Sequence, residues 1–343
     1  MTSATDTPTT LDVLVLGGTS WLGGAVARRA LDRGHRVTCL ARGEAGTPPT
    51  GASWVRADRA ASTSYDAVSN RDWDVVVDVS WQPDQVRGAL AALAARVRHW
   101  VYVSSCSVYA DDMRPGGDET APLHAPYAGT GVVGWEVYGP AKVACEEACR
   151  EAMGAEHTLL ARAGLIAGDG DRSDRFGYWP GRVDRAADGQ PVLVPPLDAP
   201  VQVIDVEDLA AWLVTAAELR TAGVLNAVGE VSCLATVLAA SAEACGRTPA
   251  LVEAADPWLA SHGVVPWSGA GSLPLWLPRA EYAGFMTRRN DAALGAGLRL
   301  RPMAETVAAA LRHEQRLGLD RKRRAGLDPG RERELLVSLS TNQ

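Results

Sequence analysis

A short, largely apolar run ends at paired glycines and is followed at once by a helical pattern: LDVLVLGGTSWLGG, residues 11–24. A strand that enters a tight glycine turn and then a helix presents backbone N–H groups to a phosphate. Gly17 allows the tight turn, and Gly23 permits close packing of the helix on the strand. Ser20 stands where the middle glycine of a G-x-x-G-x-x-G loop would be. The stretch is therefore either a variant phosphate-binding loop or a structural turn.

Up to about residue 165 the chain alternates β-branched runs with helical stretches. The pattern predicts strands at 12–16, 36–40, 53–56, 74–79, 99–104 and 157–161. It predicts helices at 22–33, 84–97 and 140–153, with a weaker one near 62–70. Several of these strands are apolar without alternation, as in strands buried on both faces. The fold class is therefore α/β, with a doubly wound parallel sheet of the Rossmann type.

The pattern loosens after residue 168, where the chain becomes rich in Gly, Pro and Asp. We expect residues 1–10 to form a flexible tail, and residues 11–167 with about 201–230 to form a dinucleotide-binding domain. Residues 168–200 and 231–343 are expected to form a smaller, C-terminal substrate-binding lobe.

Composition limits the classes of partner. The chain has 343 residues, 22% of them charged, and a net charge of −7 without a basic stripe, which argues against nucleic acid. Its six cysteines form no C-x-x-C pair, so neither a metal site nor a disulfide framework is expected. The polar N-terminus lacks the apolar segment of a signal peptide, and no apolar run is long enough to span a membrane. We expect a cytoplasmic protein and allow for a homodimer.

The end of the second strand bears on cofactor choice. NAD-binding sites usually place an acidic residue here, whereas this chain has Ala41 followed by Arg42. A guanidinium suits a 2′-phosphate, so the sequence favours NADP(H) over NAD(H), with Thr19 or Ser20 as further phosphate donors. A solvated loop arginine is the alternative. Asp58, after the third strand, is either an acceptor for the adenine amino group or a turn cap.

The motif Tyr138-Gly139-Pro140-Ala141-Lys142 places a phenol and an ammonium on one helix face. An ammonium close to a phenol favours its ionised form, which makes proton transfer near neutral pH feasible. Pro140 fits the first turn of this helix.

Hydroxyl groups gather where the fifth strand ends, in VSSCSVY, residues 103–109. The C-terminal ends of parallel strands form the ligand-binding edge of such sheets. A serine at this edge can donate a hydrogen bond to a reacting carbonyl, although serines also simply end strands.

Together these motifs, in this order, resemble the short-chain dehydrogenase/reductase superfamily. The resemblance is to its extended or atypical branch, the NAD(P)-dependent epimerase/dehydratase-like proteins, and covers roughly residues 11–230. It implies that Tyr138 donates or accepts a proton and that Lys142 binds the nicotinamide ribose. It also implies that Ser105 is the catalytic hydroxyl, with Ser107 in reserve.

The resemblance, together with the residue patterns at the second and third strands and in the aromatic-rich second lobe, predicts further site residues. The cofactor would be bound by Gly17, Thr19, Ser20, Trp21, Leu22, Gly23, Arg42, Asp58, Val79, Ser80, Ser104, Tyr138 and Lys142, and its carboxamide end by Ala163, Gly164 and Leu165. Trp81, Ser107, Tyr178 and Trp179 are the expected substrate contacts.

The second lobe is rich in aromatic residues, which form either a substrate pocket or a tryptophan-filled core. Arg172 and Arg175 fit either a solvated loop or a cover over phosphates. The expected activity is an NADPH-dependent reductase, or a dehydrogenase in reverse, acting on a small, largely apolar metabolite with Tyr138 as general acid/base. The alternatives are an epimerase or dehydratase with tightly held NAD(P), and a non-catalytic NADP-sensing protein.

Overall fold

A computed structural model describes residues 10–341; most of the expected flexible tail lies outside these residues. Its main feature is a seven-stranded parallel sheet with the strand order β10-β6-β5-β4-β1-β2-β3. Its strands are β1 (Asp12–Leu16), β2 (Arg36–Ala41), β3 (Ser53–Arg56), β4 (Trp73–Asp78), β5 (Val97–Ser105), β6 (Thr158–Ala163) and β10 (Gly223–Ala227). The predicted doubly wound sheet is confirmed.

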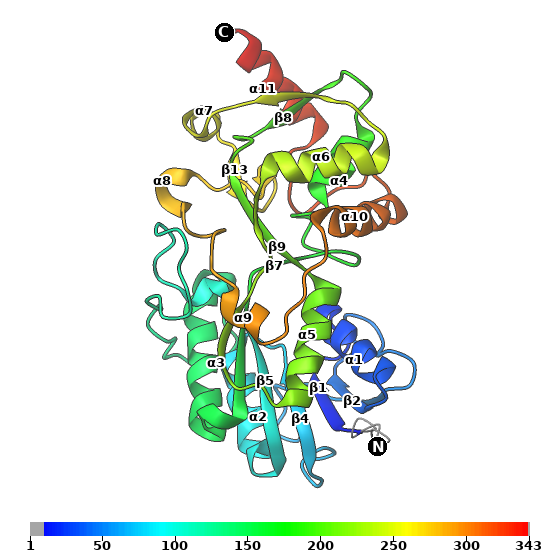
Figure 1. Cartoon of the computed structure of the whole chain (residues 1–343), viewed down its shortest axis with the longest axis vertical. Helices are drawn as coiled ribbons and strands as arrows, with labels where there is room; N and C mark the ends of the chain where they lie inside the picture. Colours follow the sequence, from blue (N-terminus) through cyan, green and yellow to red (C-terminus); the bar gives the residue numbers. More distant parts are fainter. Residues whose placement is uncertain (1–9, 342–343) are drawn as a thin grey trace, which may run out of the picture.

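Two helix layers cover this sheet (Figure 1). They comprise α1 (Trp21–Asp32) with α5 (Val206–Leu219) on one face, and α2 (Pro83–Leu93) with α3 (Tyr138–Met153) on the other. Successive side chains of β1 explain both layers, because Val13 and Val15 join the core under α1 and α5 whereas Leu14 and Leu16 join the core under α2 and α3.

Two predicted helices differ from the structure. Residues 62–70 form turns instead of a helix, because the Ser64 hydroxyl bonds to nearby backbone carbonyls and the Tyr65 hydroxyl donates to the Gln85 carbonyl. The helix predicted at 84–97 ends at Leu93, is followed by a 3-10 helix at Ala94–Arg96, and β5 begins at Val97.

The remaining elements gather mainly at the carboxyl edge of the sheet (Figure 1). The strands are β7 (Leu165–Ala167), β8 (Pro191–Val194), β9 (Pro200–Asp205), β11 (Val231–Cys233), β12 (Ala250–Glu253), β13 (Val265–Trp267) and β14 (Ser272–Pro274). The helices are α4 (Tyr178–Arg185), α6 (Leu234–Cys245), α7 (Asp256–Ser261), α8 (Arg279–Tyr282), α9 (Asp291–Gly295), α10 (Met303–Leu317) and α11 (Pro329–Thr341). Further 3-10 helices span Cys106–Val108, Trp135–Val137 and Ala155–His157.

Most of these elements pack around one hydrophobic core, which is distinct from the two cores on the two faces of the large sheet. We call the elements around this core the second lobe. Its boundaries with the dinucleotide-binding part stay a prediction. Within residues 10–341, no helix combines the length and apolarity that crossing a membrane requires.

Candidate active site

The glycine turn joins β1 to α1 with almost no room for side chains. Gly17 has a φ of 94°, and a Cβ on Gly23 would lie 2.2 Å from the Gly17 carbonyl oxygen. A Cβ on Gly18 would lie 2.4 Å from the Sγ of Cys39 in β2. Because these side chains are absent, the N-terminus of α1 approaches the end of β1, the arrangement that exposes N–H groups to a phosphate.

Ser20, at the middle-glycine position, is the N-cap of α1. Its Oγ accepts a hydrogen bond from the Gly23 N–H at 3.2 Å and donates one to the Gly17 carbonyl at 2.8 Å. The side chain therefore closes the turn on itself. Ser20 also lines the adjoining groove, so the structural role and contact with a ligand are compatible.

A groove of about 610 Å³ opens beside this turn, at the C-terminal ends of β1, β2 and β4. Such an edge is where parallel sheets bind ligands. Predicted residues that line it are Gly17, Thr19, Ser20, Arg42, Asp58, Val79, Ser80 and Trp81. The sequence analysis missed other lining residues, including Glu44, Arg59, Gln82, Gln85 and Val132.

Charged groups stand where the adenosine end of a dinucleotide would lie. Arg42 is half exposed, and its Nη2 lies 3.0 Å from Oε2 of Glu44, an acid three residues beyond Ala41 that also lines the groove. The Asp58 carboxylate accepts a hydrogen bond from the Ala60 N–H at 3.0 Å, so it caps a turn within the groove.

A buried ion pair supports the groove from beneath. The Arg59 guanidinium bonds to both carboxylate oxygens of Asp78 at 2.7 Å. Asp78 also accepts from the Ser80 N–H at 2.9 Å. The pair thus fixes the turn after β4 that carries Val79 and Ser80. No motif in the sequence indicated this pair, because it joins residues from two different strand ends.

Lys142 is 3% exposed and has no carboxylate partner among the described residues. Its Nζ donates to the carbonyl of Val103 in β5 at 2.6 Å and to the carbonyl of Ser80 at 3.0 Å, and lies 4.7 Å from the Tyr102 ring centroid. An ammonium has three N–H donors, so one remains for a ligand.

Tyr138 begins α3 and lies among tryptophans. The Trp81 and Trp135 rings stack with centroids 4.7 Å apart, and the phenol ring lies 5.4 Å from the first and 5.1 Å from the second. Trp135 is 72% exposed. No protein group in residues 10–341 bonds to the Tyr138 hydroxyl, which leaves it free to bond to a substrate.

Gly139 brings this phenol beside the serines that end β5. A Cβ on Gly139 would lie 2.2 Å from the carbonyl oxygen of Ser107, so only glycine permits this approach. The hydroxyls of Ser105 and Ser107 lie 3.2 Å apart and are partly exposed. The predicted catalytic phenol, ammonium and serines therefore converge on one edge of the sheet.

Ser104 does not belong to this group. Its hydroxyl is 2% exposed and donates to Oε1 of Glu146 at 2.6 Å. The same carboxylate binds Arg162 through two hydrogen bonds, at 2.9 and 2.8 Å. The alternation of β5 turns the Ser104 side chain under α3, away from the groove.

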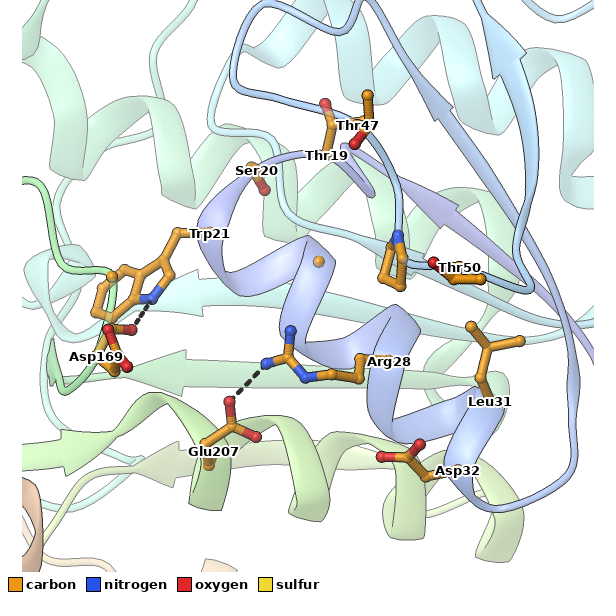
Figure 2. Close-up of a pocket in the computed structure, with 13 residues that line it drawn as sticks. Thr19, Ser20, Trp21, Arg28, Leu31, Asp32, Thr47, Thr50, Asp169 and Glu207 are labelled. Carbon is orange, nitrogen blue, oxygen red and sulfur yellow. Dashed lines mark hydrogen bonds and ion pairs between the residues drawn. The ribbon is translucent and has the colours of Figure 1, made fainter. Parts of the chain in front are cut away.

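The side chains of Trp21 and Leu22 also point away from the groove. Leu22 packs in the core below α1. The Trp21 Nε1 donates to the Asp169 carbonyl at 2.7 Å, in a second groove of about 730 Å³ along the outer side of α1 (Figure 2). In that groove Arg28 pairs with Glu207 of α5 at 2.6 Å. Trp21 thus holds the loop after β7 against the glycine turn.

The segment Ala163-Gly164-Leu165 joins β6 to β7 and is tightly packed. Ala163 and Leu165 are buried, and a Cβ on Gly164 would lie 2.9 Å from a Val228 methyl group. This segment can offer a cofactor backbone groups only, and its contact with the carboxamide stays a prediction.

Tyr178 and Trp179 do not line the candidate active site. Both are buried in the core of the second lobe, where their rings pack edge to face at 5.0 Å. The Trp179 Nε1 donates to the Pro274 carbonyl at 2.7 Å. These aromatic residues therefore fill a core instead of forming a substrate pocket.

Arg175 lies in the loop between β7 and α4. Its guanidinium lies 5.1 Å from the Trp267 ring centroid. Burial lowers the pKa of Arg175, whereas the charges of Asp171 and of the Tyr138 phenolate act in the opposite direction. Arg175 is partly buried, whereas Arg172, three residues earlier, is exposed, so the solvated-loop interpretation fits Arg172.

The sequence profile described as the NAD dependent epimerase/dehydratase family matches residues 13–228. The chain belongs to this family. No curated protein matches the chain.

Solved structures share the fold at low identity. A Burkholderia cenocepacia protein provisionally described as an epimerase has a TM-score of 0.67 and 19% identity, covering 89% of this chain and 98% of its own. A UDP-galactose 4-epimerase has a TM-score of 0.63 and 17% identity, covering 89% and 99%. A UDP-glucuronic acid 4-epimerase from Bacillus cereus, in complex with NAD, has a TM-score of 0.63 and 14% identity, covering 92% and 99%.

The residues present fit a nicotinamide dinucleotide. The glycine turn lets the N-terminus of α1 approach the end of β1, because a Cβ at Gly23 would collide with the Gly17 carbonyl, and Lys142 keeps a donor for a hydroxyl group. Across the described residues, no group of three or more His, Cys, Asp or Glu side chains is placed to hold a metal ion.

Proposed function

We propose that this protein is an NADP(H)-dependent reductase or dehydrogenase. It reduces a carbonyl group of a small, largely apolar metabolite to a hydroxyl group, or catalyses the reverse reaction. The observation that supports this proposal is that Lys142 bonds to the carbonyl of Ser80, which lines the groove, and that the start of α3 meets the end of β5 where a Cβ on Gly139 would lie 2.2 Å from the Ser107 carbonyl oxygen. Stacked Trp81 and Trp135 give the approach to the phenol an apolar wall.

The chain's own groups have distinct tasks. The bound nicotinamide supplies the hydride. Tyr138 gives its hydroxyl proton to the carbonyl oxygen of the substrate, and Ser105 donates a hydrogen bond to the same oxygen. Lys142, held by two carbonyls, directs its remaining N–H toward a ribose hydroxyl.

Arg42 supports the preference for NADP(H). Its guanidinium lines the groove beside Thr19, where a 2′-phosphate can accept charge-assisted hydrogen bonds. Glu44 opposes this preference, because its carboxylate already pairs with Arg42 and would repel a phosphate.

The cofactor test compares NADPH and NADH binding by thermal shift or fluorescence. We expect Arg42→Ala to weaken NADPH binding by about tenfold or more and to leave NADH binding nearly unchanged. Glu44→Gln should strengthen NADPH binding. Equal affinities for both cofactors, unmoved by either substitution, would refute the NADP(H) assignment.

The second candidate is an epimerase or dehydratase that uses its cofactor transiently. The family match favours it, as do structural neighbours that are UDP-sugar epimerases. It predicts NAD(P) retained through purification and no net NADPH consumption. A third candidate, a non-catalytic NADP sensor, gains no support from a chain that keeps both Tyr138 and Lys142. A cytoplasmic location, a homodimer and the lack of nucleic-acid partners stay predictions.

A further inference from the structure

A side-chain amide holds one edge of the groove in place. Residues 128–133, which we call the rim segment, form no backbone-to-backbone hydrogen bond with any part of residues 10–341. The Gln82 side chain binds this segment instead. Its Nε2 donates to the Val133 carbonyl at 3.1 Å, and its Oε1 accepts from the Val133 N–H at 2.9 Å. One amide thus satisfies both backbone groups of one residue, as a neighbouring strand would.

A second side chain from the same turn supports the rim segment. Gln82 is the N-cap residue of α2, and Asp84 lies in the first turn of this helix. The Asp84 Oδ2 accepts from the Gly131 N–H at 2.6 Å. Gly131 has a φ of 85°, a left-handed conformation that other residues rarely adopt. The rim segment therefore depends on two side chains at the start of α2 for its position.

These bonds place an exposed apolar side chain at the groove. Val133 is 6% exposed, whereas Val132 is 85% exposed and lines the groove together with Gln82. Trp135 is 72% exposed and stacks on Trp81, which lines the same groove. Among the large apolar residues of the described chain, Val132 and Trp135 expose the two largest fractions. Single exposed apolar residues are ordinary, but two at the edge of one groove indicate a surface that a ligand covers.

The rest of the groove lining indicates the class of this ligand. The groove opens at the glycine turn, where the N-terminus of α1 suits a pyrophosphate. Its lining extends from Gly17 and Arg42 to Trp81 and Val132. A dinucleotide that fills the groove therefore contacts the Val132 side chain.

We propose that Gln82 is a positioning residue, which holds Val132 over the dinucleotide site so that this side chain packs on the bound cofactor. Apolar surface of Val132 leaves water when the cofactor binds, and this burial strengthens association. The inference rests on the proposed function only for the presence of a nicotinamide dinucleotide, and it applies to NADP(H) and NAD(H) alike.

The test follows the accessibility of position 132 in the full chain. Val132→Cys introduces a thiol there, and its rate of reaction with a maleimide is measured with and without saturating NADPH or NADH. We expect the bound dinucleotide to slow this reaction by about tenfold or more, because the side chain leaves water. Val337→Cys is the matched control, since Val337 is 62% exposed in α11, and its rate should not change. The wild type, with partly exposed Cys233 and Cys245, gives the background rate.

Adding Gln82→Met to Val132→Cys tests the positioning role. This substitution removes both bonds to Val133, so most of the protection should disappear and dinucleotide binding should weaken by about fivefold to tenfold. Asp84→Ala removes one bond to the rim segment from a residue outside the groove lining, and it should reduce the protection less. A merely structural role of Gln82 would lower stability and leave the protection intact. If Gln82→Met does not fold, Asp84→Ala decides, and full protection in it overturns the positioning role.

Cofactor binding, measured in the same samples by fluorescence or calorimetry, separates the possible failures. A dinucleotide that binds without slowing the reaction at position 132 overturns the contact with Val132 and leaves the proposed function intact. Protection that persists in Gln82→Met overturns the positioning role of Gln82. No binding of either dinucleotide would overturn both this inference and the proposed function.

Discussion

The large sheet and the second lobe bury their aromatic and charged residues in different ways. At the carboxyl edge of the sheet, no described residue bonds to the Tyr138 hydroxyl, and the partners of the Lys142 ammonium within residues 10–341 are two backbone carbonyls. In the second lobe, Tyr178 and Trp179 are sealed in a core, and Arg182 bonds to Glu332 at 2.7 Å. The comparison teaches that the two regions differ in surroundings: the proposed reactive groups lie beside a groove lined by Ser80 and Trp81, whereas Tyr178, whose hydroxyl also has no partner in the described chain, and Arg182 are enclosed in the second lobe.

Substitution of the two tyrosines tests this contrast most strongly. Tyr138→Phe removes the proposed acid, so turnover should fall by about 10²- to 10⁴-fold while cofactor binding is retained. Tyr178→Phe, the matched control, removes a buried hydroxyl that has no hydrogen-bond partner in the described chain, and turnover should be unchanged. Steady-state kinetics with cofactor titrations would check both. Full turnover in Tyr138→Phe would eliminate this residue as the acid.

Substitutions of two adjacent glycines test whether the close approach of α1 to β1 is needed for dinucleotide binding. A Cβ on Gly23 would lie 2.2 Å from a backbone oxygen, whereas a Cβ on Gly24 would lie 3.7 Å from its nearest neighbour. Gly23→Ala should therefore abolish measurable dinucleotide binding and Gly24→Ala should preserve it, as followed by cofactor fluorescence. Similar affinities in the two variants would show that the close approach of α1 to β1 is not what shapes the cradle.

Substitutions of two tryptophans compare the effect on stability of a core residue with that of an exposed one. Trp179→Ala should lower the free energy of unfolding by about 3–5 kcal/mol, because it removes a buried ring. Trp135→Ala, at an exposed ring, should lower it by less than about 1 kcal/mol but weaken substrate binding. Urea unfolding measures the first effect and KM the second. A small loss of stability in Trp179→Ala would contradict its place in the core.

The smallest expected effect is a pH dependence of stability from the large sheet. Burial, and then the charges of Arg220 and His157, lower the pKa of His99 in β5 from 6.5 to about 4. The unfolded chain therefore binds a proton between these values that the folded chain does not, so stability should fall as pH drops from 6.5 to 4. His99→Phe should flatten this slope in urea unfolding series, and an unchanged slope would assign it to other groups.

Sequence patterns predicted the large sheet well because its determinants are local. The apolar runs of β1 and β4, the glycine turn and the Tyr138–Lys142 spacing each lie within a few residues. The helix predicted at 62–70 was wrong because the side chain of a single serine, Ser64, bonds to the backbone.

The second lobe resisted prediction because its determinants are distant in sequence. Trp179 bonds to Pro274, and Arg175 lies over Trp267, more than 90 residues away. Neither contact leaves a periodic signal. The Arg59–Asp78 ion pair was not predicted for the same reason, because its two residues follow different strands. Trp135, by contrast, lies three residues before Tyr138 and could have been predicted from that position.

The hydroxyl of Ser20 has a thermodynamic consequence. Because it bonds to both Gly17 and Gly23, the loop's shape is set by hydrogen bonds within the chain and does not depend on a bound phosphate. A glycine at this position would leave the turn more conformational freedom to lose on association. With serine, the turn loses this conformational entropy when the chain folds, so less of it remains to be lost when a ligand binds.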